Sequence, residues 1–183
     1  MPSGTKQARF EREVMPHLDA AYNLARWLLH DPHDAEDATQ DAILRALRFL
    51  DSFRGGNAKA WLLAIVRHAC YSHARMRRDT PLDEQDPSHA RADSAEAFAM
   101  GLQPRASPEA ELIAKDRKDL VNLCLETLPA EFREVLVLRD LEGLMYREIS
   151  EVAGVPLGTV MSRLSRARAL LHKAVAVRMR GGA

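Results

Sequence analysis

The sequence predicts an all-α fold, with two small helical domains joined by a flexible linker and a helix-turn-helix in the C-terminal domain. Apolar residues recur at helical spacing in both halves, and no stretch alternates with β-branched residues as a strand would. Prolines and glycines fall between these runs, where they end helices. The acidic, proline-containing residues 80–108 separate an N-terminal domain, residues 1–79, from a C-terminal domain, residues 109–183.

Three helices are expected in the N-terminal domain. The first spans about Arg9–Leu29, where apolar residues form one stripe. The second begins at Pro32, because proline is tolerated in a first helical turn, and continues to Leu50. A turn at Arg54–Asn57, which contains two glycines, precedes the third helix, Ala58–Arg77.

Four helices are expected in the C-terminal domain, after a linker with a short helix around residues 95–100. They cover Pro108–Leu128, Pro129–Glu142, Tyr146–Ala153 and Leu157 to about Val177. Gly143 and Gly154 stand where helices should stop, which predicts left-handed backbone at both.

Composition and charge restrict the function. The 183 residues contain no apolar run near the roughly 18 needed to span a bilayer and no secretory signal, so a cytoplasmic location is expected. Cys70 and Cys124 are far apart and predict buried, reduced thiols rather than a disulfide or zinc site. Net charge is zero, but acid-free basic blocks at residues 52–78 and after Glu151 suggest two contacts with DNA.

The most informative segment is residues 146–164, a short helix, a glycine turn and a second helix, as in a helix-turn-helix. Val160, Leu164, Ala167 and Leu171 give the second helix an inner stripe. Its outer face can hold phosphates through hydroxyls and backbone N–H groups, and guanine edges through arginine. The alternative is an ordinary bundle with a solvated basic helix; the preceding helix and turn make it less favourable. The outer residues are Thr159, Ser162, Arg163 and Arg166.

Two N-terminal helices carry opposite charge. The helix at Pro32–Leu50 presents an acidic face with an exposed leucine, which suits a basic protein partner or, alternatively, only the helix dipole. The far end of the helix at Ala58–Arg77 interleaves basic, imidazole and aromatic side chains, which suits a nucleic-acid backbone and unpaired bases. Trp61 is interpreted as core rather than as a stacking platform.

Two sets of motifs resemble a known family. The first set is residues 34–46 (DAEDATQDAILRA), 53–56 (FRGG), 61–62 (WL) and 65–67 (IVR). The second set is residues 128–139 (LPAEFREVLVLR), 142–149 (EGLMYREI) and 158–168 (GTVMSRLSRAR). The first set resembles region two, and the second region four, of the extracytoplasmic-function (ECF) sigma factors of the sigma-70 family. Both regions occur in the family's order, and only the linker and the chain ends lie outside the resemblance.

The resemblance implies a transcription initiation factor that binds core RNA polymerase and promoter DNA, without cofactor or enzymatic activity. The β′ clamp helices would be bound by Asp37, Gln40, Asp41, Leu44 and Arg48. The minus-ten element would be bound and its melting assisted by Arg54, Asn57, Lys59, Arg67, His68, Tyr71, His73, Arg75, Arg77 and Arg78. The minus-thirty-five element would be bound by Tyr146, Arg147, Gly158, Thr159, Ser162, Arg163, Arg166 and Arg168. The C-terminal domain would also touch the β flap, and an anti-sigma factor is an expected partner.

Four residues depart from the family's pattern. Met161 stands where lysine or arginine is frequent, and Ser165 where a larger side chain is common. His68 and Ser72 replace a frequent asparagine and aspartate. The promoter sequence therefore cannot be carried over from relatives.

The sequence also bears on two other function classes. An enzyme or metal site is disfavoured, because His68, Cys70 and His73 diverge around a helix and no nucleophile-and-base set occurs. A self-contained helix-turn-helix regulator with an N-terminal sensing or dimerisation domain is the nearer alternative. Such a regulator does not require a second basic block beside an acidic helix, whereas this chain has both. Weak DNA affinity is expected for the free chain, because the acidic linker lies beside both basic blocks.

Overall fold

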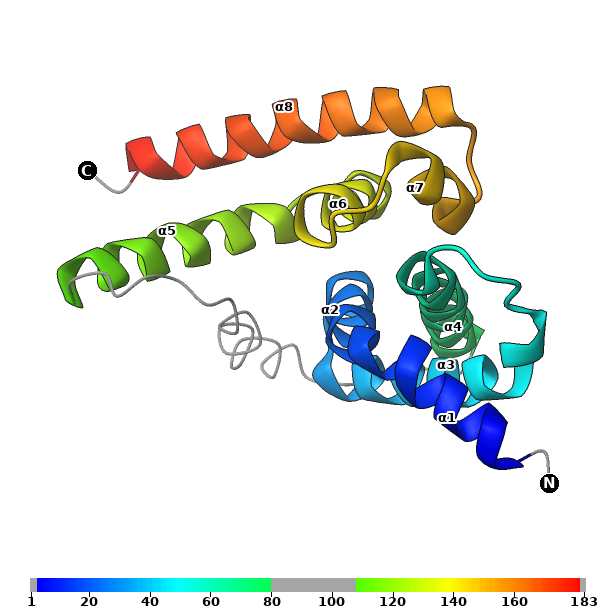
Figure 1. Cartoon of the computed structure of the whole chain (residues 1–183). Helices are drawn as coiled ribbons and strands as arrows, with labels where there is room; N and C mark the ends of the chain where they lie inside the picture. Colours follow the sequence, from blue (N-terminus) through cyan, green and yellow to red (C-terminus); the bar gives the residue numbers. More distant parts are fainter. Residues whose placement is uncertain (1–2, 80–107, 182–183) are drawn as a thin grey trace.

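The computed structural model describes residues 3–79 and 108–181, and within them every element is helical. The all-α prediction is confirmed. Figure 1 shows the N-terminal helices α1–α4 as one layer and the C-terminal helices α5–α8 as a second layer against it. The predicted linker, including the helix expected around residues 95–100, lies outside the described residues. None of the helices described is long and apolar enough to cross a membrane.

The N-terminal layer begins with two helices where one was predicted. Helix α1 (Ser3–Glu13) ends before a 3₁₀ turn, η1 (Met15–His17), and α2 (Leu18–Leu29) follows. The single helix predicted over Arg9–Leu29 is therefore wrong. Pro16 lacks the N–H that an α-helix needs and its ring crowds the preceding turn, so the chain bends there. The apolar stripe continues through the bend, since Val14 is fully buried.

Helices α3 (Pro32–Phe49) and α4 (Ala58–Asp79) complete this domain, with the 3₁₀ turn η2 (Leu50–Ser52) after α3. The Asp31 side chain accepts a hydrogen bond from the Asp34 N–H at 3.0 Å and caps α3. Four alanines of α3 are fully buried, which lets α2 and α4 pack close to it. They are Ala35, Ala38, Ala42 and Ala46.

The C-terminal layer contains α5 (Pro108–Glu126), α6 (Ala130–Leu136), α7 (Tyr146–Ala153) and α8 (Leu157–Gly181). The predicted helix Pro129–Glu142 instead ends at Leu136 and continues as a π-helical turn, η4 (Val137–Leu141). The Glu142 N–H bonds to the Val137 carbonyl at 2.9 Å, five residues back. Apolar periodicity cannot distinguish such a turn from α-helix, because Val137 and Leu138 stay buried in both.

The helix-turn-helix formed by α7 and α8 follows the prediction closely. Helix α7 has the predicted bounds, and the Glu148 carboxylate accepts a 2.7 Å hydrogen bond from the Met145 N–H at its start. Gly154 ends α7 with φ +65°, and Gly143 has φ +73°, so both predicted left-handed positions are confirmed. Val160, Leu164 and Ala167 of α8 are buried in the core that also contains Ile149.

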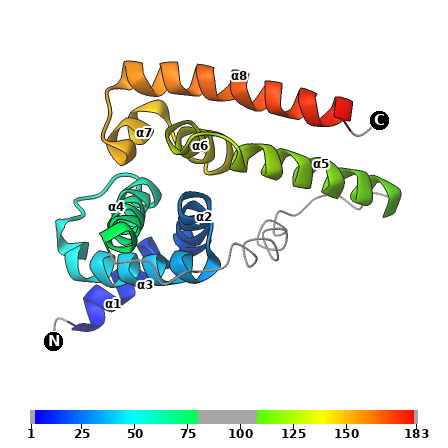
Figure 2. The ribbon, with the colours of Figure 1, turned by 180° about the vertical axis from the view of Figure 1, so that it is seen from behind.

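The two domains are packed against each other, which the prediction of two domains on a flexible linker did not include. Helix α4 packs against α7, and α2 packs against α6. Figures 1 and 2, seen from opposite sides, both show α2 and α4 next to the C-terminal layer, with α1 and α3 on the far side. The buried apolar residues of both domains form one cluster. The surface between them thus has the character of a protein interior.

Both cysteines are buried, and neither forms a disulfide, as predicted. Burial raises the pKa of the Cys70 thiol to about 12.

We therefore expect Cys70 of the native Cys124→Ala variant to react with a thiol reagent far more slowly at pH 8 than in denaturant. Its rate should rise about tenfold per pH unit, since the thiolate is the reacting species. Prompt labelling of the native protein at pH 8, followed by absorbance, would contradict this burial.

Candidate polymerase and nucleic-acid interfaces

The outward face of α3 presents the residues predicted to bind polymerase. Asp37, Gln40, Leu44 and Arg48 are exposed on the side opposite the buried alanines, and the Leu44 residue is 64% exposed. Asp41 is half-buried and pairs with Arg45 at 2.8 Å, one turn later on the helix. The face therefore combines carboxylates with an apolar side chain held on a rigid element.

The apolar part of α3 is larger than predicted. Leu47 and Phe49 are also exposed, at 38% and 54%. Leu44 was the one exposed apolar residue predicted on α3, although Leu47 likewise lies off the alanine stripe, a signal that could have identified it. Exposed apolar side chains beside charged ones are characteristic of protein-binding surfaces.

The structure divides the residues predicted to bind the minus-ten element among different sides of α4. His68 and Arg75 are exposed to solvent, whereas Arg67 and Tyr71 face the C-terminal domain. His73 is about 140° around the helix from His68. Arg77 forms an ion pair with Asp34 of α3. Arg54 is exposed in the loop before α4, and the side chain of Arg78 lies outside the described residues.

Four of these predicted residues are bonded to glutamates of the C-terminal domain. Arg67 forms an ion pair with Glu134, and the Tyr71 hydroxyl donates to the same carboxylate at 3.3 Å. The Lys59 ammonium lies 2.7 Å from Glu142 Oε2 and 2.8 Å from the Glu142 carbonyl. The Asn57 amide donates to Glu148 Oε1 at 2.7 Å. We call the three glutamates Glu134, Glu142 and Glu148 the acidic edge.

The acidic edge changes the environment of Tyr71. Burial first, and the nearby Glu134 carboxylate second, raise the pKa of the Tyr71 phenol. The Arg67 guanidinium carbon also lies 4.6 Å from the centre of the Tyr71 ring. Tyr71 therefore stays a neutral hydrogen-bond donor at neutral pH.

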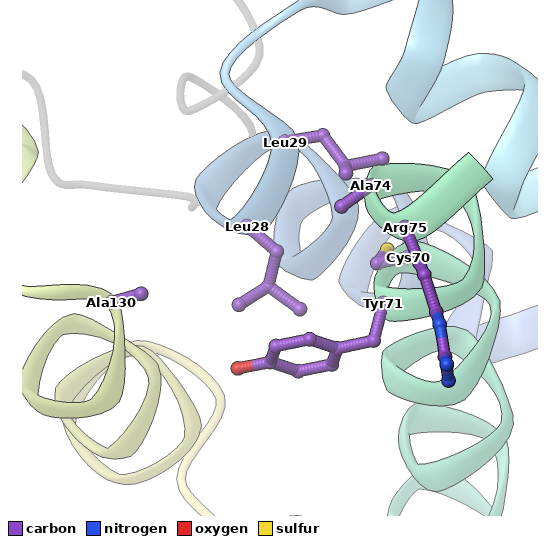
Figure 3. A pocket seen from close by; sticks show the side chains of 7 residues that line it. All are labelled: Leu28, Leu29, Cys70, Tyr71, Ala74, Arg75 and Ala130. Carbon is purple, nitrogen blue, oxygen red and sulfur yellow. The ribbon is translucent and has the colours of Figure 1, made fainter. Parts of the chain in front are cut away.

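A cavity of about 470 Å³ lies beside this contact, between α2, α4 and the start of α6 (Figure 3). Figure 3 shows the Tyr71 ring extending from α4 toward the helix that carries Ala130. The cavity is mostly apolar, and Arg75 is the charged residue among those that line it. Its lining residues are Leu28, Leu29, Cys70, Tyr71, Ala74, Arg75 and Ala130.

The arginines of α8 differ in what they contact. Arg163 pairs with Glu131 at 3.3 Å, and Arg168 pairs with Asp140 at 2.8 Å. Arg166 is exposed and has no hydrogen-bond or ion-pair partner among residues 3–79 and 108–181. Of the three, Arg166 is the one whose guanidinium can reach a base edge without breaking a contact inside the domain.

The remaining predicted residues of the helix-turn-helix surround this position. Gly158 and Ser162 are exposed on the outer face of α8, and Thr159 is half-buried near its start. Arg147 is exposed on α7, while the Tyr146 ring lies 5.1 Å from the guanidinium carbon of Arg139. Met161 is also on the exposed part of α8, with 54% of its surface accessible, and was not among the predicted contacts. An apolar side chain there can contact a thymine methyl group.

Comparisons with known proteins agree with this architecture. The Sigma-70 region 2 model matches residues 14–80, and the Sigma-70, region 4 model matches residues 118–171. The RNA polymerase sigma-H factor of Pseudomonas aeruginosa is 34% identical over 175 residues, which cover 94% of this chain and 88% of that protein. The chain belongs to the ECF sigma factors of the sigma-70 family.

Two further similarities support the assignment of this sigma factor. The ECF RNA polymerase sigma-E factor of Escherichia coli strain K12 is 36% identical over 147 residues, covering 78% of this chain and 74% of the relative. The sigma factor RpoE of Bartonella quintana, solved in complex with the anti-sigma factor NepR, matches with a TM-score of 0.65 and 31% identity. That match covers 92% of this chain and 97% of the solved one.

Family membership decides between the function classes considered above. As an alternative sigma factor, this chain directs RNA polymerase to promoters, and sigma factors are transcription initiation factors rather than enzymes. None of the comparisons supports a self-contained regulator with a sensing domain.

Proposed function

We propose that this sigma factor, acting in the cytoplasm, divides its contacts among three surfaces. Helix α3 binds the clamp helices of the polymerase β′ subunit, α4 and the preceding loop bind the minus-ten element, and α7 with α8 binds the minus-thirty-five element. The first domain, residues 1–79, thus combines polymerase and minus-ten binding, and residues 109–183 form the second. The observation that carries the proposal is the exposed face of α3, where Asp37 and Asp41 accompany Leu44 on the side opposite the buried alanines.

The minus-ten contact is supported by the composition of the loop before α4 and of α4 itself. Arg54, His68 and Arg75 are exposed, and all three lie within residues 52–78, which contain no aspartate or glutamate. Basic side chains next to an imidazole can hold a phosphate backbone while a base stacks beside it. Four further residues of the proposed contact are bonded to the acidic edge, namely Asn57, Lys59, Arg67 and Tyr71.

The minus-thirty-five contact is expected to depend on Arg166 for base preference. Arg166→Ala in the holoenzyme should weaken binding by about 1–3 kcal/mol and relax preference at one base pair, because one bidentate contact is lost. Arg168→Ala, the control, should weaken binding almost equally on all sequences, since Arg168 pairs with Asp140 beside the helix. Selection from a randomised promoter library measures both. An Arg166→Ala loss that is the same on every sequence would assign Arg166 to a phosphate.

The anti-sigma factor in the Bartonella quintana structure suggests a similar partner here. We propose that such a protein holds this sigma factor until a signal releases it, and that the C-terminal domain also contacts the polymerase β flap. Size-exclusion chromatography of the chain with a co-expressed candidate partner tests the first point.

The decisive experiment for the proposed function is reconstitution. Core polymerase mixed with this chain should initiate transcription on genomic DNA at a restricted set of start sites that core alone does not use. Mapped start sites should share two sequence elements at the spacing of minus-ten and minus-thirty-five. Absence of new start sites would refute the proposed function.

A further inference from the structure

Met161 is an apolar side chain on the exposed part of α8, the helix proposed to meet DNA. It is the fifth residue of that helix, and 54% of its surface is accessible. The core side of α8 is supplied by Val160, Leu164 and Ala167, which are buried. Burial inside the domain therefore does not account for a methionine at position 161.

Small residues lie next to Met161 along the helix. Gly158 precedes it by three residues and Ser165 follows it by four, the spacings at which helical residues are neighbours, and both are exposed. A Cβ built on Gly158 would meet no atom within 4 Å, so the surface there is open. The methionine side chain therefore projects beyond its neighbours. Because it is unbranched and has three rotatable bonds, it can adapt its shape to an apolar group.

The side chains near Met161 differ from it in chemistry. The Ser162 hydroxyl donates to the Thr159 carbonyl at 3.0 Å, and the Arg166 guanidinium suits a guanine edge. Arg166 is five residues from Met161, roughly 7.5 Å along the helix axis and about 140° around it. Neighbouring base pairs are only about 3.4 Å apart, so the two side chains reach different base pairs. Met161 has no hydrogen-bond donor, and its contact with a base is therefore apolar.

The apolar group that a base edge presents in the major groove is the 5-methyl group of thymine. 5-Methylcytosine carries the same methyl group on the same ring carbon, although it pairs with guanine instead of adenine. A thioether side chain packed against this methyl group removes apolar surface of both from water. Such a contact distinguishes pyrimidines by their methylation and not by their pairing.

We propose that Met161 reads the 5-methyl group of one pyrimidine in the minus-thirty-five element, either thymine or 5-methylcytosine. The inference rests on the proposed minus-thirty-five contact of α7 and α8. It places an apolar reader beside Arg166, at a different base pair. Methylation of a cytosine at that base pair therefore strengthens promoter binding by this sigma factor without any change in base sequence.

The test removes the methyl group from the DNA and the methionine from the holoenzyme, separately and together. The DNA is the best promoter from the randomised library. In its minus-thirty-five element, on either strand, each thymine is replaced singly by uracil, which lacks only the methyl group, and each cytosine by 5-methylcytosine. Methylated and unmethylated fragments, labelled with two dyes, compete for limiting holoenzyme below the temperature of promoter melting. At one position the wild type should prefer the methylated fragment about fourfold, as burial of one methyl-sized group predicts.

Holoenzyme with Met161→Ala should bind the two fragments equally at that position. Alanine is the best helix former and position 161 is exposed, so the variant should keep its fold. The matched control is Met179→Ala, which makes the same change on the same helix at a residue that is 67% exposed. Because Met179 lies at the far end of α8, this variant should keep the fourfold preference.

Two results would overturn the assignment of Met161. One is wild-type holoenzyme that binds methylated and unmethylated fragments equally at every position. The other is a preference that survives in Met161→Ala, because another side chain would then read the methyl group. Either result leaves the proposed function intact when the wild-type holoenzyme has selected a minus-thirty-five sequence from the library. If it selects no such sequence, the proposed minus-thirty-five contact fails, and this inference fails with it.

Discussion

Leu44→Asp is expected to abolish promoter-specific transcription by weakening the binding of this sigma factor to core polymerase. Leu44 is the most exposed apolar residue of α3, at 64%, and lies among Asp37, Gln40 and Arg48. A carboxylate buried against the partner would cost about 2–4 kcal/mol, as loss of an interface anchor does. The dissociation constant should rise about 30- to 1,000-fold, measured by competition with a labelled sigma factor for core polymerase.

Met179→Asp is the matched control for this prediction. Met179 is equally exposed, at 67%, but lies at the far end of α8. It should bind core polymerase as the wild type does, and circular dichroism should show that both variants retain their helices. If Leu44→Asp still competed normally for core polymerase, α3 would not be the polymerase-binding helix.

Leu164→Ala is expected to destabilise the C-terminal domain by about 2–5 kcal/mol, because it leaves a cavity where a buried leucine was. Leu164 is 1% exposed and lies in the core between α7 and α8. A domain of this size has little stability in reserve, so the loss should unfold a measurable fraction of molecules at growth temperature. Urea denaturation followed by circular dichroism gives the change in free energy of unfolding.

The control, Leu170→Ala, makes the same chemical change on the same helix. Leu170 is 39% exposed, so the substitution removes fewer contacts and leaves no enclosed cavity. It should cost less than half as much as Leu164→Ala. Equal losses for the two variants would contradict the assignment of Leu164 to the core.

The sequence predicted most of the helices because their burial follows a simple period. The alanine stripe of α3 and the apolar stripe of α8 were both visible in this way, and Gly143 and Gly154 located two helix ends. The break at Pro16 was missed because the apolar stripe continues through it. The π-helical turn at Val137–Leu141 was missed because five-residue hydrogen bonding leaves the same side chains buried.

The candidate site was less predictable than the fold. Residue types indicated that Arg67, Lys59 and Tyr71 suit DNA, but composition gives no sign that Glu134 and Glu142 are bonded to them. Contacts between residues more than 60 positions apart depend on how two domains dock, and no local pattern reports that. The same limit applies to the arginines of α8, since only the structure separates Arg166 from Arg163.

Glu148 performs two tasks with separate oxygens. Oε2 accepts from the Met145 N–H at the start of α7, while Oε1 accepts from Asn57 of the other domain. The first bond lies within the C-terminal domain, so the cap of α7 does not depend on the contact with Asn57. Position 148 is therefore constrained by two requirements at once, whereas positions 134 and 142 can vary without removing this cap. The polar contact between the domains can accordingly diverge between related chains while the start of the helix-turn-helix stays capped.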